Sequence, residues 1–269
     1  MTYELLIDCG NTFLKWGRYH PHGGGSNGNA ASTTTTDTPA ATTASEQCIE
    51  FNRVLLDEIR SLPGLWRRYE APVKVIISSV AGTRVRNPIL RALEAWPDAP
   101  APVFVVSQAE QCGVRNRYLN PGQLGSDRWA SLIGARALIP DKPVLIAVCG
   151  TATTIDFLSA AGEFEGGSIL PGLGLMQRVL HEQTAALPDA QGEYVENPRQ
   201  TVDAITTGCT HAQVGAIERL FAVHSRLHPD LRCLISGGAA SNLIPRLTIP
   251  FVYHENLVLE GLYRMASEH

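Results

Sequence analysis

The stretch that decides the fold class is Tyr3–Tyr19, with the sequence YELLIDCGNTFLKWGRY. Its first part, Tyr3–Asp8, is typical of a short strand that ends in a carboxylate. Gly10–Thr12 supply turn residues, and Phe13–Tyr19 has the composition of a second strand. The stretch therefore predicts a β-hairpin with a polar tip.

The same plan returns in the second half of the chain. Val144–Val148 predicts a strand, Gly150–Thr153 a turn of small residues, and Thr154–Leu158 a second strand. A unit that recurs along a chain indicates related parts of one architecture. We expect an α/β fold of two similar halves, residues 1–122 and 123–269, with a nucleotide cleft between the two hairpin tips.

Helices and strands alternate around these hairpins. The apolar patterns predict strands at Val73–Val80, Val103–Val106 and Cys233–Ser236, and helices at Ile49–Leu62, Asn87–Trp96, Leu124–Leu138, Gly172–Glu182, Val202–Leu227 and Asn256–Ala266. Such alternation is typical of an open, mostly parallel sheet with helices on its faces.

A segment of low complexity interrupts the first half. Gly23–Gln47 is rich in Gly, Ser, Thr and Ala and has too few large apolar residues to offset the entropy of ordering. Its glycine run lacks the lysine and the following helix that a phosphate-binding loop needs. We expect a disordered insertion.

Charge and hydropathy argue against several classes of partner. The formal net charge is -4, and the 22 Lys and Arg residues are scattered along the chain, so we expect no nucleic-acid partner. No apolar stretch is long enough to cross a membrane, and Met1–Glu4 lead into a strand in place of a secretory leader. We expect a cytoplasmic protein without a membrane partner.

The cysteines and histidines lack the common zinc-binding motifs. The six cysteines form no CxxC pair, and none of the eight histidines belongs to an HExxH pattern. The chain also lacks the GxxxxGK[ST] phosphate loop, the GxSxG elbow and a complete dinucleotide fingerprint. These absences exclude the common designs of zinc hydrolases, P-loop kinases and nicotinamide enzymes.

The first hairpin tip has two interpretations. As a plain turn, Asp8–Thr12 is a hairpin capped by an Asx side chain. As a phosphate site, the backbone N–H groups of the tip would bind phosphate while Asp8 holds Mg²⁺ through water, with Lys15 adding positive charge near the transferred group. The recurrence of the tip at Gly150–Thr153 favours the phosphate site.

The segment Gly125–Arg128 also allows two interpretations. It opens a helix, so Asp127 is either a helix cap beside a surface arginine or a catalytic base. In the second case Asp127 would accept the proton of a bound alcohol while Arg128 holds an anionic group of the same substrate. Phosphoryl transfer needs mainly positioning and charge stabilisation, so one base together with phosphate donors can suffice.

Taken in order, these segments resemble the type III pantothenate kinases. That family includes proteins called Bvg accessory factors and belongs to the superfamily of acetate and sugar kinases, heat-shock proteins and actin. The resemblance runs nearly end to end, apart from the insertion. It depends on Ile7–Thr12 with Lys15 and Trp16, Ile77–Val80, Leu124–Trp129, Gly150–Asp156, Gly166-Gly167, Pro171-Gly172, Thr184–Pro188 and Leu257–Leu262.

The resemblance implies two actin-like (ribonuclease H-like) halves, a homodimer, and transfer of the ATP γ-phosphate to pantothenate, giving 4′-phosphopantothenate on the route to coenzyme A. It implies Asp127 as the proton acceptor. The implied ATP contacts are Asp8, Cys9, Gly10, Asn11, Thr12, Phe13, Leu14, Lys15 and Thr151. The implied pantothenate contacts are Tyr118, Gly125, Ser126, Asp127, Arg128 and Thr201, the last reaching a neighbouring subunit's site.

One position departs from the family's pattern. Many relatives have an aspartate, associated with a monovalent cation, three residues before the threonine of the second tip. Here that residue is Val148, beside Cys149. A valine cannot ligate a hard cation, so we expect activation by K⁺ or NH₄⁺ to be weaker or built from other ligands.

Two other functions fit the same fold. A regulatory or accessory protein could keep the fold and ATP binding, although the presence of Asp8, Lys15, Asp127 and Arg128 argues against a dead enzyme. A kinase of the same superfamily could instead use a sugar, glycerol or a carboxylate, because the fold does not fix the substrate.

Overall fold

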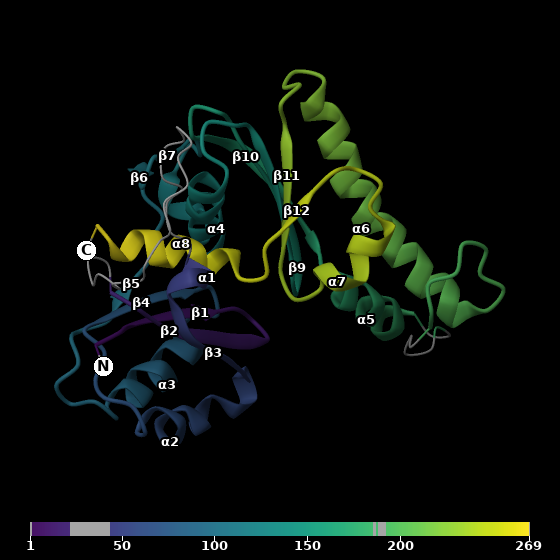
Figure 1. Cartoon of the computed structure of the whole chain (residues 1–269). Coiled ribbons are helices and arrows are strands. Elements are labelled where there is room, and N and C mark those ends of the chain that lie inside the picture. Colours follow the sequence, from purple (N-terminus) through teal and green to yellow (C-terminus); the bar gives the residue numbers. More distant parts are fainter. Residues whose placement is uncertain (1, 22–43, 185–186, 188–191, 269) are drawn as a thin grey trace, which may run out of the picture. The chain divides into compact units, whose positions relative to one another are not determined.

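The computed structural model describes residues 2–21, 44–184, 187 and 192–268 (Figure 1). Most of the insertion expected at 23–47, and most of the motif at 184–188, lie outside the described residues. The last four residues of that insertion, Ala44–Gln47, instead form the short helix α1. No helix among the described residues is long and apolar enough to cross a membrane.

The chain forms two compact units. The first consists of Met1–Cys112, Gly122–Leu138 and Val258–His269, and the second of Gly113–Pro121 and Ile139–Leu257. Both units are therefore discontinuous in sequence, whereas the expected boundary at residue 122 divides the chain only once. Each unit is described by itself below.

Each sheet is assembled around one of the two expected hairpins. The strands are β1 (Glu4–Cys9), β2 (Phe13–Tyr19), β3 (Cys48–Leu55), β4 (Lys74–Ser79), β5 (Val103–Phe104), β6 (Glu110–Gln111), β7 (Val114–Asn116), β8 (Val144–Cys149), β9 (Ala152–Leu158), β10 (Glu163–Pro171), β11 (Arg232–Ser236) and β12 (Val252–Tyr253). The sheet orders are β3-β2-β1-β4-β5 and β12-β11-β8-β9-β10-β7-β6.

The five strands of the first sheet have counterparts with the same topology in the second, in which β7 and β6 are additional. β1 pairs with β2 antiparallel and with β4 parallel, and β8 pairs with β9 antiparallel and with β11 parallel. A third antiparallel strand follows each hairpin, β3 beside β2 and β10 beside β9, and β5 and β12 add in parallel. The repeat predicted from Tyr3–Tyr19 and Val144–Leu158 is confirmed, as is the α/β class.

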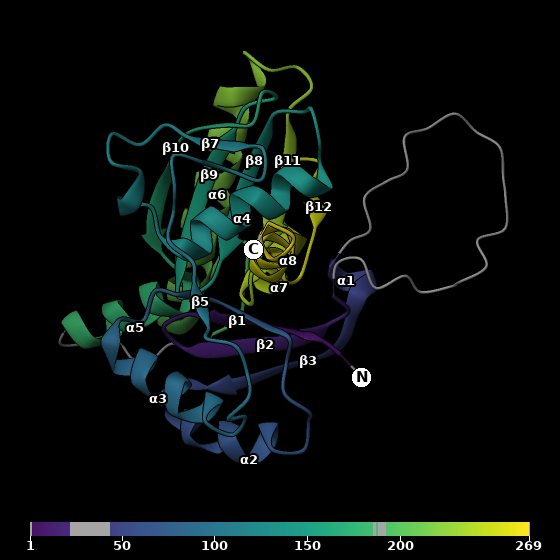
Figure 2. The ribbon, with the colours of Figure 1, turned by 90° about the vertical axis from the view of Figure 1, so that its left-hand side faces the viewer.

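Helices connect the strands. They are α2 (Leu62–Trp66), α3 (Thr83–Leu93), α4 (Ser126–Leu138), α5 (Leu173–Gln183), α6 (Thr201–Ser225), α7 (Ala240–Leu243) and α8 (Leu257–Ala266), with 3-10 turns at Leu56–Ser61, Pro121–Gln123 and Ile244–Arg246. In the first unit α2 and α3 lie on one face of the sheet, and α4 and α8 lie on the other (Figures 1 and 2).

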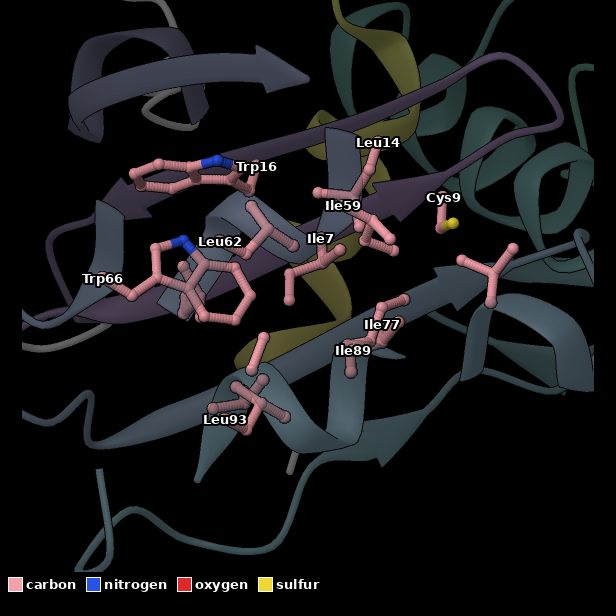
Figure 3. Packing of buried hydrophobic residues seen from close by; sticks show 14 of the residues in the cluster. Ile7, Cys9, Leu14, Trp16, Ile59, Leu62, Trp66, Ile77, Ile89 and Leu93 are labelled. Atoms are coloured by element: carbon pink, nitrogen blue, oxygen red, sulfur yellow. The ribbon is translucent and has the colours of Figure 1, made fainter. Parts of the chain in front are cut away.

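The core of the first unit lies between its sheet and α2 and α3. Ile7 and Ile77 of the central strands pack against Ile89 of α3, and all three side chains are fully buried (Figure 3). Trp66 stacks on Trp96 with ring centroids 5.3 Å apart. This dense packing fixes the positions at which β1 and β4 end.

The helix expected at Ile49–Leu62 is wrong. Cys48–Leu55 is strand β3, paired with β2, and only Leu56–Ser61 forms a 3-10 turn. The segment occupies a sheet edge, where β-branched and aromatic residues such as Ile49 and Phe51 fit a pleated, half-buried surface. This tertiary context overrides the local helical spacing.

The long strand β10 was not expected. Its two central glycines, Gly166 and Gly167, suggest a loop, but they lie at a β-bulge where the pairing with β9 shifts between Phe164 and Gly166. Glycine inside a strand commonly marks such a bulge.

Candidate active site

The first hairpin tip ends β1 with exposed backbone. The Gly10 N–H donates to the Phe13 carbonyl at 3.1 Å, and the side chains of Asn11 and Thr12 are exposed. The Leu56 N–H donates to the Thr12 carbonyl at 3.0 Å, which anchors the tip to the following 3-10 turn. The tip is thus fixed in place while the side chains of Asn11 and Thr12 are exposed to solvent.

Asp8 stands directly before this tip. It is partly buried, lies opposite Lys15 on β2 and opposite Ser78 on β4, and belongs to the same unit as Asp127. Burial raises the pKa of Asp8 to about 7; the charge of Asp127 adds to the rise and that of Lys15 opposes it. A bound cation would relieve both the burial and the repulsion, so Asp8 fits a role in holding Mg²⁺.

Asp127 lies in the first turn of α4. The Arg128 N–H donates to its carboxylate Oδ1 at 2.8 Å, and its own carbonyl accepts a hydrogen bond of 2.8 Å from the Ser131 hydroxyl. Partial burial raises the pKa of Asp127, while the hydrogen bond and charge of Arg128 oppose the rise. The carboxylate is therefore held in one orientation and has a greater proton affinity than an exposed aspartate.

The absence of a side chain at Gly125 makes that orientation possible. A Cβ atom at this position would lie 2.6 Å from Asp127 Oδ1. The Trp129 N–H donates to the Gly125 carbonyl at 2.9 Å, so this backbone cannot move away without losing the first turn of α4. The glycine predicted as a substrate contact thus also controls the position of the Asp127 carboxylate.

The other members of the predicted ATP and substrate segments differ in exposure. Phe13 is exposed, whereas Cys9 and Leu14 pack in the core, so any contact of Cys9 or Leu14 with ATP would come from backbone atoms. Arg128 is buried, and Ser126 is buried with its hydroxyl directed to β4. The first unit therefore brings together Asp8, Lys15 and the start of α4.

The second tip, in the other unit, has the same hairpin geometry. The Gly150 N–H donates to the Ala152 carbonyl at 3.0 Å, and Thr151 is exposed. The Gly172 N–H donates to the Thr151 carbonyl at 2.9 Å, and a Cβ at Gly172 would lie 2.1 Å from the Gly150 carbonyl oxygen. Only glycine allows this close approach of the backbone to the tip.

Tyr118 and Thr201 also belong to the second unit. The Tyr118 N–H donates to Asn116 Oδ1 at 3.0 Å, and its ring packs on Phe164 with centroids 5.1 Å apart. Thr201 is the first residue of α6 and lines a cavity of about 620 Å³ between α5 and α6. The walls of this cavity are mostly apolar.

The second tip does not reproduce a cation site. Val148 occupies the register position of Asp8, because each stands opposite a serine on the parallel neighbour strand, Ser236 and Ser78 respectively. Thr154 lies opposite Val148, and its buried Oγ1 has no hydrogen-bond partner among the described residues. The valine side chain supplies no oxygen, so these side chains do not fit the carboxylate-bound cation of the family's pattern.

Sequence reasoning missed one polar residue of the site. Ser78 is fully buried, and its hydroxyl lies 2.9 Å from that of Ser126. The sequence signal was the segment Ile77–Val80, which contributes to the family resemblance but assigns no role to Ser78. No group of three or more His, Cys, Asp or Glu side chains in the described part of the chain could hold a metal ion.

Residues 4–223 match the model of the type III pantothenate kinase family. The chain belongs to this family. A type III pantothenate kinase of Aromatoleum aromaticum is 45% identical over 264 residues, covering 98% of both chains.

Solved structures of other proteins have a similar fold although their sequence identity to this type III pantothenate kinase family member is low. A Campylobacter jejuni protein assigned to the Baf family of transcriptional activators is 17% identical, with a TM-score of 0.56, and 98% of each chain is covered. A Sinorhizobium meliloti protein assigned as a 2-dehydro-3-deoxygalactonokinase is 13% identical, with a TM-score of 0.57, covering 99% of this chain and 98% of that one. These likenesses extend over nearly the whole of each chain and confirm the expected α/β fold.

Proposed function

We propose that the protein transfers the γ-phosphate of ATP to the hydroxyl of pantothenate, giving 4′-phosphopantothenate, the first step toward coenzyme A. The observation that carries the proposal is the oriented carboxylate of Asp127 in the same unit as Asp8 and Lys15. The match to the kinase family and the near full-length similarity to its members support it.

Asp127 is the proton acceptor in this proposal. Its carboxylate would take the proton of the pantothenate hydroxyl as the oxygen attacks the phosphorus, and a positioned base of this kind contributes about 10²–10⁴-fold to a rate. The bond from the Arg128 N–H holds one carboxylate oxygen, which leaves the other for the substrate. Gly125, Ser126, Arg128, Tyr118 and Thr201 are the proposed pantothenate contacts.

The first tip binds the triphosphate in this proposal. Backbone N–H groups of Gly10–Thr12 would donate to phosphate oxygens, and Lys15 would stabilise the charge of the transferred group. Mg²⁺ supplies charge neutralisation to the phosphates when it is bound, and Asp8 would hold it through water. Thr151 on the second tip is the further proposed ATP contact.

We also propose a homodimer. The apolar cavity between α5 and α6 is lined by Leu175, Leu180 and Ile205, and Val179 and Leu180 are exposed. A second copy packed on this face would remove that apolar surface from water. Light scattering of the purified protein should give twice the 29.1 kDa chain mass, and a monomer would contradict the proposal.

The cytoplasm is the proposed location. All six cysteines lie in the described part of the chain and are free thiols, and burial raises the pKa of Cys9 and Cys149 to about 12. Thiols of this kind suit a reducing compartment.

A comparison of acceptors tests the function. The purified protein is incubated with Mg-ATP and, in separate reactions, pantothenate, glycerol, a hexose or acetate, and ADP release is measured. The proposal expects turnover with pantothenate far above the other three. Turnover with another acceptor would change the substrate, and ATP binding without any turnover would favour a regulatory protein.

A further inference from the structure

A hydrogen-bonded pair of serines connects the two elements that carry Asp8 and Asp127. The hydroxyl oxygens of Ser78 and Ser126 are 2.9 Å apart, and the Ser79 N–H donates to Ser126 Oγ at 3.2 Å. Both side chains are buried, with Ser78 at 0% and Ser126 at 7% exposure. The start of α4 is therefore attached to the end of β4 by two hydrogen bonds.

The attachment lies beside both carboxylates. Ser78 stands opposite Asp8 across the parallel pairing of β4 with β1, and Ser126 directly precedes Asp127 in the first turn of α4. Any change in how α4 begins against β4 would therefore move Asp127 relative to Asp8.

A buried hydroxyl at position 78 carries a desolvation cost that an apolar side chain would avoid. Ile76 and Ile77 precede Ser78 on β4, so an apolar residue would suit the core, whereas a buried hydroxyl must be hydrogen-bonded to avoid a desolvation cost. Unlike an apolar contact, the hydrogen bond of Ser78 fixes the distance and orientation of Ser126, because a hydrogen bond weakens steeply as its length and angle change.

The second unit offers a matched position. Ser236 stands opposite Val148 as Ser78 stands opposite Asp8, and it is equally buried. Its hydroxyl donates to the Glu255 carbonyl and accepts from the Leu257 N–H, each at 3.4 Å. Here a serine holds the start of α8, but no carboxylate occupies the neighbouring strand position.

We propose that Ser78 is a positioning residue for phosphoryl transfer: through its hydrogen bond to Ser126 it sets the place of Asp127 relative to Asp8. This inference rests on the proposed function, in which Asp127 is the base. Ser78 itself touches neither substrate.

The first experiment compares Ser78→Ala with Ser236→Ala in the full-length protein. Each change removes one buried hydroxyl from the same strand position of its unit, so the loss of stability should be similar in both. We expect kcat with pantothenate to fall about 10–100-fold in Ser78→Ala, because small misplacements of reacting groups cost up to about that factor. We expect KM for ATP to change less than about threefold, and Ser236→Ala to keep kcat within about threefold.

The second experiment repeats Ser78→Ala in an Asp127→Asn background. If Ser78 acts through Asp127, the added change leaves the residual kcat of Asp127→Asn unaltered, whereas a purely structural loss lowers it by the same factor as in the wild type. If Ser78→Ala folds poorly, Ser78→Cys, whose thiol has a similar shape but is a much weaker hydrogen-bond partner, replaces it in both backgrounds with the same expected fall in kcat.

The outcomes separate the two proposals. A kcat of Ser78→Ala within threefold of the wild type, or an equal loss in both backgrounds, overturns the positioning role. Normal turnover by Asp127→Asn alone overturns the proposed base and hence the function as stated. A large loss in Asp127→Asn with a normal Ser78→Ala leaves the function standing and removes only the inference.

Discussion

Asp8 at the end of β1 and Asp127 at the start of α4 interact electrostatically within the first unit, and the charge of Asp127 raises the pKa of Asp8. The two residues are 119 positions apart in sequence, so the fold alone makes them neighbours. Like charges kept together in a partly buried site are unfavourable without a cation or ligand. The pair is thus better suited to binding than to stabilising the free protein.

The raised pKa of Asp8 predicts a pH-dependent stability. Between its ordinary pKa near 3.8 and its folded pKa of about 7, the folded state keeps a proton that the unfolded state has released. Stability of the ligand-free protein should therefore decrease as the pH rises through this window. We expect Asp8→Asn to be more stable than the wild type by up to about 4 kcal/mol at about pH 8, and nearly equal to it at about pH 4.

Thermal unfolding of both proteins across this pH range, without nucleotide or Mg²⁺, checks the prediction. A wild-type stability that increased with pH relative to Asp8→Asn would show that Asp8 is stabilised as a carboxylate in the free protein.

Gly125→Ala should displace the carboxylate of Asp127, the proposed base, without unfolding the protein. The new Cβ would lie 2.6 Å from Asp127 Oδ1, so that carboxylate must leave its hydrogen bond with the Arg128 N–H. We expect kcat to fall at least about tenfold. Gly215→Ala, an exposed position of α6 with nothing within 4 Å, is the control and should keep kcat while stabilising the helix slightly. Equal kcat values for the two variants would contradict the role of Gly125.

Val148 predicts weak dependence on monovalent cations. Because the side chain has no oxygen, exchanging K⁺ for Na⁺ should alter wild-type turnover less than about twofold. Val148→Asp should make turnover depend more strongly on K⁺, since a carboxylate would stand opposite the unpartnered Thr154 hydroxyl. Initial rates in matched KCl and NaCl buffers measure this, and strong saturable activation of the wild type by K⁺ would argue against it.

The tryptophan cluster predicts where the first unit is most sensitive to truncation. Trp66 is fully buried, stacks on Trp96 and meets the edge of Trp16 at 5.9 Å between ring centroids. Trp66→Ala should lower the free energy of unfolding by about 3–5 kcal/mol. Urea unfolding followed by circular dichroism measures it, with Leu227→Ala, at a position that is 76% exposed, as a control that should change little. A loss below about 1 kcal/mol would show that the cluster is loosely packed.

The hairpins and most of the helices could be predicted from sequence because their signals are local. Tyr3–Tyr19 and Val144–Leu158 each have turn residues between apolar runs, and both hairpins are confirmed. Strand β3 could not be predicted in this way, because it forms by pairing with β2, which lies far away in sequence. The membership of α4 and α8 in the first unit likewise depends on contacts far apart in sequence.

The candidate site was accessible to sequence reasoning only in part. Asp8, Lys15 and Asp127 were recognisable from their motifs, but how they are held was not. Ser78 has the composition of an ordinary strand end, and its role depends on a hydroxyl that arrives from Ser126, 48 residues later. That a Cβ at position 125 would collide with the Asp127 carboxylate likewise becomes evident only from the backbone geometry.

The most direct test of the account is the turnover of Asp127→Asn with pantothenate and Mg-ATP. Asparagine keeps the size and can still accept the Arg128 N–H hydrogen bond, but it cannot take a proton from the substrate. We predict that kcat falls by about 10²–10⁴-fold while ATP binding, measured by calorimetry, is retained. A folded Asp127→Asn protein that binds ATP and phosphorylates pantothenate at the wild-type rate would contradict the assignment of the base.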